Sequence, residues 1–223
     1  MSEIVTIIAE DIFNQIRKDL PNAGVTYCEN PAPSGQHSIL VDTDSAIDVF
    51  TFLRDTEGLK FDYLSNVSGV DYPKGDLADT VTAPKSDDAG DNSEEGEETE
   101  TTGEFLEVVY HLYSMARKTA EPLVLRQRTQ DRGENNAVTS VQPIFRSAEF
   151  QEREAFDLFG IDFTGHPDLR RILMWDEFED FPMRKDYVNP DDYEYEPTPH
   201  ADVLKRAEAH YPQADSEDAD SQD

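Results

Sequence analysis

The sequence predicts an α+β fold: a single sheet with helices packed on one face, interrupted by an acidic insertion and followed by an extended C-terminal arm. Two observations carry this prediction. Segments with apolar residues at helical spacing alternate along the chain with short runs typical of strands. Between two expected strands, residues 76–103 are rich in Asp, Glu, Gly, Ser and Thr. They hold too few bulky apolar side chains to offset their ordering entropy, so we expect a disordered insertion.

The same patterns divide the chain into three parts. Residues 1–75 and 104–187 are predicted to form one α+β domain, separated by the insertion at 76–103. Residues 188–223 are rich in Asp, Glu, Tyr and Pro and have no apolar core of their own. We expect them to form an extended acidic arm and tail.

The first half of the domain is predicted to begin with a helix that ends at Pro21. Its apolar face consists of Ile4, Ile7, Ile8, Ile12, Ile16 and Leu20. Two short strands are expected at residues 25–28 and 38–41, on either side of a loop rich in Pro and Gly. A second helix, capped at residues 44–45, is expected to end at Gly58.

The second half is predicted to contain three strands and one helix. The strands are expected at residues 61–70, 105–115 and 123–129. The second of them is apolar on both faces, which indicates that both are covered, whereas the third places arginines opposite its leucines. Residues 138–145 lead into a helix over about 147–159. The expected order is helix, two strands, helix, three strands, helix.

The charge is strongly acidic, with 49 acidic residues against 19 basic ones and a formal net charge of −30. Phosphate binding needs a basic surface, so nucleic acid is excluded as a partner. Acidic residues are also spread through the folded parts, where lysines are few. Such a surface suits a cytoplasm of very high salt, because the Debye length falls to about 3 Å at 1 M.

Cysteine content and hydropathy restrict the class of protein further. Cys28 is the only cysteine in the sequence, so the chain cannot hold an iron–sulfur cluster or a cysteine zinc site unaided. An intrachain disulfide is equally impossible, which fits a reducing compartment. The first residues lack the basic region of a secretory signal, and no apolar run approaches the ~20 residues that span a bilayer. We therefore expect a cytoplasmic location.

The most informative segment is 152–171, which we call the signature segment. A helix dense in both charges is expected to end at Gly160, where a C-cap favours positive φ. A turn and two adjacent arginines follow. Its charged and turn residues are Glu152, Arg153, Glu154, Asp157, Gly165, His166, Pro167, Arg170 and Arg171. We expect Arg153, Glu154 and Asp157 to share one side of the helix.

Two interpretations of these charges are open. In the first, Glu154 and Asp157 accept hydrogen bonds from Arg170 or Arg171, and the ion pairs hold the loop in place. In the second, some of the charges reach a neighbouring subunit. The two interpretations are compatible.

A catalytic use of the signature segment must also be weighed. Glu152, Glu154, Asp157 and His166, together with Asp168, could supply metal ligands or an acid/base pair. Their spacing matches no metal motif, and His166 before Pro167 is more typical of a structural hydrogen bond. Phosphate-binding glycine loops and nucleophile elbows are missing from the sequence. A free-standing acidic, metal-dependent enzyme therefore remains only a remote alternative.

The signature segment closely resembles the motif of the thirty-kilodalton subunit (the C subunit) of proton-translocating NADH:quinone oxidoreductase (respiratory complex I). Arg184, Lys185 and Asp186, followed by Tyr187, fit the same family. So do the stretches 52–54, 59–64, 69–72, 105–112 and 138–141, and the resemblance covers about residues 45–187 apart from the insertion. The sequence departs from the family at Phe150, where tryptophan is usual, and near Phe181.

The resemblance implies a non-catalytic structural subunit of the peripheral arm. In that family the complex oxidises NADH through FMN and iron–sulfur clusters, reduces quinone and translocates protons, while the thirty-kilodalton subunit holds no cofactor or metal. It implies partners among the hydrophilic-arm subunits, especially the quinone-site subunit (the D subunit) and the adjacent cluster-bearing subunit (the B subunit). It also implies a peripheral position on the cytoplasmic face of the cell membrane.

By the same resemblance, the signature residues, Gly160 and the 184–186 run serve structure or interface rather than catalysis. The alternative within the same group is the equivalent subunit of a membrane-bound hydrogenase or of an F420- or ferredoxin-dependent quinone oxidoreductase.

Overall fold

The computed structural model describes residues 9–30, 36–74, 103–119 and 121–188. The predicted insertion at 76–103 lies outside the described residues except for Gly103, and the predicted arm at 188–223 does so except for Val188. The predicted start of the first helix, before residue 9, is outside them as well.

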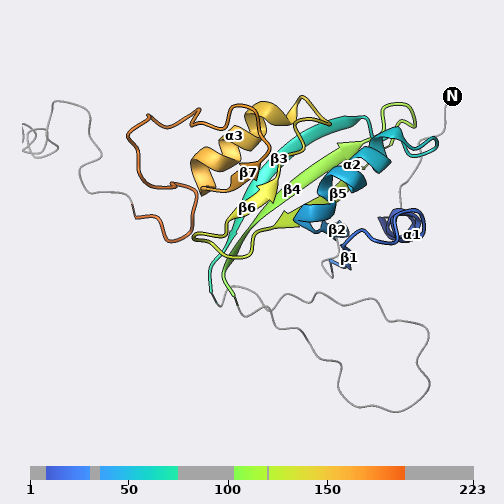
Figure 1. Ribbon diagram of the computed structural model, residues 1–223, viewed down its shortest axis with the longest axis horizontal. Coiled ribbons are helices and arrows are strands. Elements are labelled where there is room, and N and C mark those ends of the chain that lie inside the picture. The colour runs from blue at the N-terminus through green and yellow to red at the C-terminus, as the bar shows by residue number, and fades with distance from the viewer. Residues whose placement is uncertain (1–8, 31–35, 75–102, 120, 189–223) are drawn as a thin grey trace, which may run out of the picture. The chain divides into compact units, whose positions relative to one another are not determined.

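A five-stranded mixed sheet forms the centre of the described domain (Figure 1). Its strands are β1 (Val25–Cys28), β2 (Ser38–Val41), β3 (Tyr63–Tyr72), β4 (Phe105–Tyr113) and β5 (Leu123–Arg128), in the order β1-β2-β5-β4-β3. Neighbours run antiparallel except for the parallel pair β2 and β5. These are the five strands expected from the sequence, with β3 shifted two residues toward the C-terminus.

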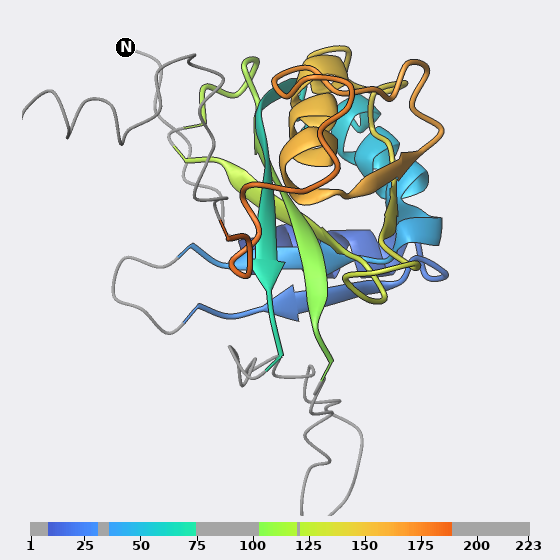
Figure 2. The same cartoon turned by 90° about the vertical axis from the view of Figure 1, so that its left-hand side faces the viewer.

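Among the described residues there are three α-helices, α1 (Ala9–Asp19), α2 (Ala46–Asp55) and α3 (Ala148–Phe159), and a 3-10 turn η1 (Thr43–Ser45) precedes α2. Helices α2 and α3 cover the same face of the sheet, as Figures 1 and 2 show from two directions. The core lies between them and the sheet. Phe50 of α2 packs edge-on against Tyr110 of β4, with ring centroids 5.0 Å apart, and both side chains are fully buried. The α+β prediction is confirmed.

A second, two-stranded sheet was not predicted. Strand β6 (Ala137–Thr139) pairs in parallel with β7 (Asp162–Thr164), which follows α3. Each strand has three residues, too few for alternation to be visible in the sequence. Their pairing requires the chain to return to β6 after α3, so it depends on the tertiary structure. This small sheet fixes the point at which the chain leaves α3.

Both faces of β4 are covered, as predicted. On the helix side Leu106, Val108, Tyr110 and Leu112 belong to the core. On the other face Glu107 is fully buried and forms ion pairs with Arg126 and Arg128 of β5. The guanidinium of Arg128 also lies 3.9 Å from the ring centroid of Phe105. The two arginines predicted opposite the leucines of β5 therefore balance one buried acid.

Candidate functional site

The signature segment forms α3 and the loop after it. Helix α3 ends at Gly160, which has φ +71° and whose N–H donates to Phe156 O. The predicted left-handed C-cap is confirmed. A Cβ at Gly160 would lie 2.6 Å from the ring of Phe181 and 2.7 Å from Arg184 Nη2. Glycine is therefore required here both for its backbone angle and for the close approach of the 181–184 stretch.

Asp157 organises the loop. Its carboxylate is fully buried, and Oδ2 accepts from the backbone N–H groups of Ile172, Leu173 and Met174 at 2.9, 2.6 and 2.9 Å. Oδ1 accepts from Arg171 Nη1 at 2.7 Å. Burial acts to raise the pKa of Asp157, but these donors outweigh it and hold the pKa below its usual value. The Asp157 carboxylate is therefore charged and joins helix α3 to residues 172–174 of the loop.

Two arginines of this region, the buried Arg153 and the partly buried Arg171, bind backbone carbonyls. Arg153 Nε donates to Arg170 O at 3.1 Å, and its Nη2 donates to Arg171 O at 3.2 Å. Arg171 donates to Asp157 O at 3.0 Å and to Asp180 O at 3.2 Å. Guanidinium groups that bind several carbonyls fix a loop without leaving buried acceptors unpaired.

The structure corrects two of the expected pairings. Arg170 does not contact Glu154 or Asp157; its side chain is 68% exposed and pairs with Asp168 at 3.0 Å. Glu154 is exposed and does not share the buried side of α3 with Arg153 and Asp157. Residues 153 and 157 are one turn apart under the loop, whereas residue 154 is rotated about 100° from 153 toward solvent. Of the two interpretations, the intrachain network is present, but it uses Arg171.

Glu152 is a buried carboxyl with neutral partners. Its Oε1 accepts from Val141 N at 2.8 Å, and its Oε2 lies within hydrogen-bond distance of Ser140 Oγ. Burial raises its pKa to about 7, and the hydrogen bonds from Ser140, Val141 and Gln142 only partly offset this. Glu152 thus ties α3 to the residues after β6, and it is poised to titrate near neutral pH.

The turn 165–167 is held by its histidine. Gly165 has φ +88°, and His166 Nε2 lies 3.0 Å from Glu149 O on α3. His166 Nδ1 accepts from Asp168 N at 3.1 Å, which leaves the proton on Nε2 for Glu149 O. The expected structural hydrogen bond of His166 is confirmed. Pro167 is exposed at the tip of the turn.

The 184–186 stretch is held against the domain in part by a pair of side chains, Asp71 and Arg132, that the sequence did not predict. Arg184 Nε donates to Phe159 O at 2.7 Å, at the end of α3. Asp71, at the end of β3, binds Arg132 through both oxygens at 2.7 and 2.9 Å and accepts from Lys185 N at 2.7 Å. Asp186 pairs with the same arginine at 2.8 Å. Arg132 lies between the expected strand at 123–129 and residues 138–145, and 61 residues separate it from Asp71, so local pattern carries no signal for this pair.

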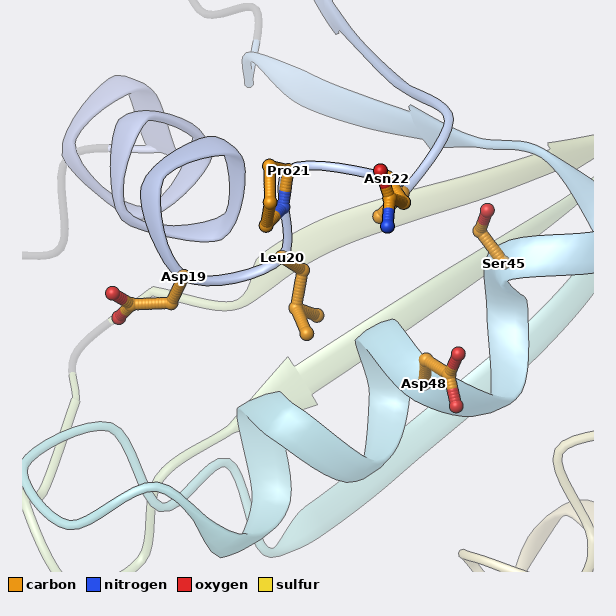
Figure 3. A pocket seen from close by; sticks show the side chains of 7 residues that line it. Asp19, Leu20, Pro21, Asn22, Ser45 and Asp48 are labelled. Atoms are coloured by element: carbon orange, nitrogen blue, oxygen red, sulfur yellow. The ribbon is translucent and has the colours of Figure 1, made fainter.

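These acids and His166 do not converge on a catalytic centre. Glu152, Asp157 and His166 each bind a different part of the chain, and Glu154 faces solvent. Within the described ranges, no group of three or more His, Cys, Asp or Glu is arranged to hold a metal ion. A shallow pocket between the end of α1 and the start of α2 is lined by Asp19, Leu20, Pro21, Asn22, Ala23, Ser45 and Asp48 (Figure 3). Its two carboxylates point to different sides of Leu20.

No helix among the described residues is long and apolar enough to cross a membrane.

Comparison with known proteins identifies the family. The model of the family described as respiratory-chain NADH dehydrogenase, 30 Kd subunit, matches residues 39–193. The C subunit numbered 2 of the NADH-quinone oxidoreductase of Rhizobium meliloti (strain 1021) is 36% identical over 157 residues, 70% of this chain and 68% of that protein. The C subunit of the NADH-quinone oxidoreductase of Caulobacter vibrioides is 34% identical over 187 residues, 84% and 75% of the two chains.

A solved chain of the membrane-bound sulfane sulfur reductase, an archaeal respiratory membrane complex, shares the fold. It superposes with a TM-score of 0.54 at 21% identity, and the match covers 96% of this chain and 98% of that one. The family itself is shown by the match of the family model over residues 39–193 and by the identities above 30%. This chain belongs to the 30 kDa subunit family of the respiratory-chain NADH dehydrogenase.

Proposed function

We propose that this chain is a non-catalytic structural subunit of the peripheral arm of NADH:quinone oxidoreductase. Family membership and relatives named as the C subunit of that enzyme support the assignment. The same names favour it over a hydrogenase or an F420- or ferredoxin-dependent complex. In the assembled enzyme the chain supports electron transfer from NADH to quinone, coupled to proton translocation, by holding its neighbours in position.

The observation that carries the structural role is the use made of the charges in the signature segment. The side chains of three residues form hydrogen bonds to the backbone of the following loop or to each other. They are Asp157, Arg153 and Arg171. A catalytic carboxylate needs a reachable proton or substrate atom, whereas the Asp157 carboxylate is buried under four donors. Such an arrangement builds a rigid surface, which is what a scaffold subunit requires.

Cofactors and partners follow from this role. We propose that other subunits carry the iron–sulfur clusters, since a single cysteine cannot ligate a cluster, and the FMN, since the sequence has no glycine-rich phosphate loop. The partners we propose are the quinone-site subunit (the D subunit) and the cluster-bearing subunit next to it (the B subunit). Through them the chain is held at the cytoplasmic face of the cell membrane.

The test separates assembly from turnover. In a strain without this chain, wild-type and Asp157→Ala chains are expressed, and both the amount of assembled complex and its NADH:quinone turnover per complex are measured. We expect Asp157→Ala to reduce the assembled amount while each assembled complex keeps its turnover. Full assembly with lost turnover would instead place a catalytic group in this chain.

A further inference from the structure

Large exposed apolar side chains are concentrated on α3 and in the loop that follows it. Of the nine exposed large hydrophobic residues within the described part of the chain, five lie on α3 or in residues 172–183. They are Phe150, Ile172, Leu173, Trp175 and Met183, which we call the α3–loop surface. Leu173 is 61% exposed and Trp175 47%. Clustered apolar exposure of this kind marks an interaction site rather than ordinary surface.

The α3–loop surface is rigid because α3 holds it from beneath. Asp157 binds the N–H groups of residues 172–174, and Met183 N donates to Leu158 O at 3.1 Å. Between these points, the Arg171 guanidinium lies 5.5 Å from the ring of Phe178 and 5.4 Å from that of Phe181. A loop ordered before association loses less entropy on binding, so its contacts contribute more fully to affinity.

The charged side chains within residues 172–183 are of one sign. Residues 172–183 include four carboxylates and no basic side chain. These four, Asp176, Glu177, Glu179 and Asp180, are exposed, as is Glu154 on α3. None of these carboxylates forms an ion pair with another of the described residues. The apolar centre is therefore bordered by unneutralised negative charge.

Resting on the proposed function, we propose that the α3–loop surface is the docking surface of this chain for a neighbouring subunit, and that the partner's matching surface is apolar at its centre and bordered by Lys and Arg. Apolar contact at the centre slows dissociation, because hot spots are buried aromatic and aliphatic anchors. Opposite charge at the rim speeds association and disfavours other acidic surfaces.

The experiment measures association and dissociation rates of the full-length chain with the complex purified from a strain that lacks it. In the rim variant, Asp176→Asn, Glu177→Gln, Glu179→Gln and Asp180→Asn remove four charges. The matched control carries Asp11→Asn, Asp19→Asn, Asp48→Asn and Glu57→Gln, four exposed positions on α1, α2 and the following turn. Both variants change the net charge equally, so only the position of the charges differs.

At the lowest salt concentration at which wild type keeps its fold, we expect the rim variant to associate about tenfold more slowly than the matched control, with the difference vanishing near 1 M salt. Trp175→Ala and Leu173→Ala should each dissociate about tenfold faster than wild type. Ile47→Ala, an equivalent exposed position on α2, should not. Thermal unfolding of each variant verifies that the fold is retained.

The outcomes distinguish this inference from the proposed function. If the rim variant associates as fast as its control, or faster, the proposal that the partner's surface is bordered by Lys and Arg is wrong. If Trp175→Ala and Leu173→Ala dissociate at the same rate as Ile47→Ala while wild type binds, the α3–loop surface is not the docking surface. If the wild-type chain itself fails to bind the depleted complex, the proposed function is wrong, and this inference is overturned with it.

Discussion

Asp157 Oδ1 and Arg171 Nη1 lie 2.7 Å apart across 14 residues of sequence, with the side chain of Asp157 fully buried and that of Arg171 14% exposed. The neighbouring Arg170, one residue earlier, is 68% exposed and pairs outside this network. Two adjacent arginines in one motif thus have different physical roles, and the difference can be measured.

We expect Arg171→Ala to lower the free energy of unfolding by about 3 kcal/mol, because it leaves a buried carboxylate without its cation. The loss lies at the lower end of the usual range since Asp157 keeps three backbone donors. Arg171→Lys should recover little of it, because lysine cannot reproduce the several bonds of a guanidinium. Urea unfolding measures both. Arg170→Ala is the control, expected within about 0.5 kcal/mol of wild type as a surface change; a larger loss there than at Arg171 would contradict the assignment.

Glu152 should make stability depend on pH between about 4.5 and 7. Its folded pKa of about 7 exceeds the value of 4.5 for an unperturbed carboxyl. The folded state therefore holds the proton more tightly, and the stability from this group is complete below pH 4.5 and lost as pH rises through 7. The shift corresponds to about 3 kcal/mol. The stability difference between wild type and Glu152→Gln, measured at pH 5 and pH 8, should change by this order; a constant difference would show that Glu152 stays in one protonation state.

Gly160→Ala and Gly165→Ala separate backbone strain from steric contact. Both glycines have positive φ, but a Cβ at Gly165 meets nothing within 4 Å, whereas one at Gly160 meets Phe181 and Arg184. Gly165→Ala should cost about 1 kcal/mol from the left-handed backbone alone. Gly160→Ala should cost clearly more and also loosen the 181–184 stretch. Thermal unfolding ranks the two, and equal losses would mean that the contact with Phe181 yields without cost.

Arg132→Ala should release the 184–187 stretch from the end of β3. It removes the bidentate partner of Asp71, which is 2% exposed, and the partner of Asp186 as well. We expect an unfolding loss of about 3–5 kcal/mol and faster amide exchange at Lys185, whose N–H donates to Asp71. Arg170→Ala, which removes an exposed pair with Asp168, is the control and should change neither. Unaltered exchange at Lys185 in Arg132→Ala would show that Asp71 holds the stretch by itself.

Local pattern was enough to predict the three helices, the five strands of the main sheet and the fold class. The periodic apolar residues of α1 and α2, the alternation in β5 and the C-cap at Gly160 are each determined by residues within a few positions of one another. The hydrogen bond from Asp168 N to His166 Nδ1 is likewise local. The family resemblance came from one dense local motif.

Only the tertiary structure decided which charges meet. The sequence could not tell Arg170 from Arg171, because in a loop the direction of a side chain is set by what the backbone packs against, and here that is Asp157 and the carbonyls of α3. Asp71 and Arg132 lie 61 residues apart and are brought together by the sheet. Burial in the folded domain raises the pKa of Glu152. The pairing of β6 with β7 requires the chain to return after α3. Neither is visible in a local sequence pattern.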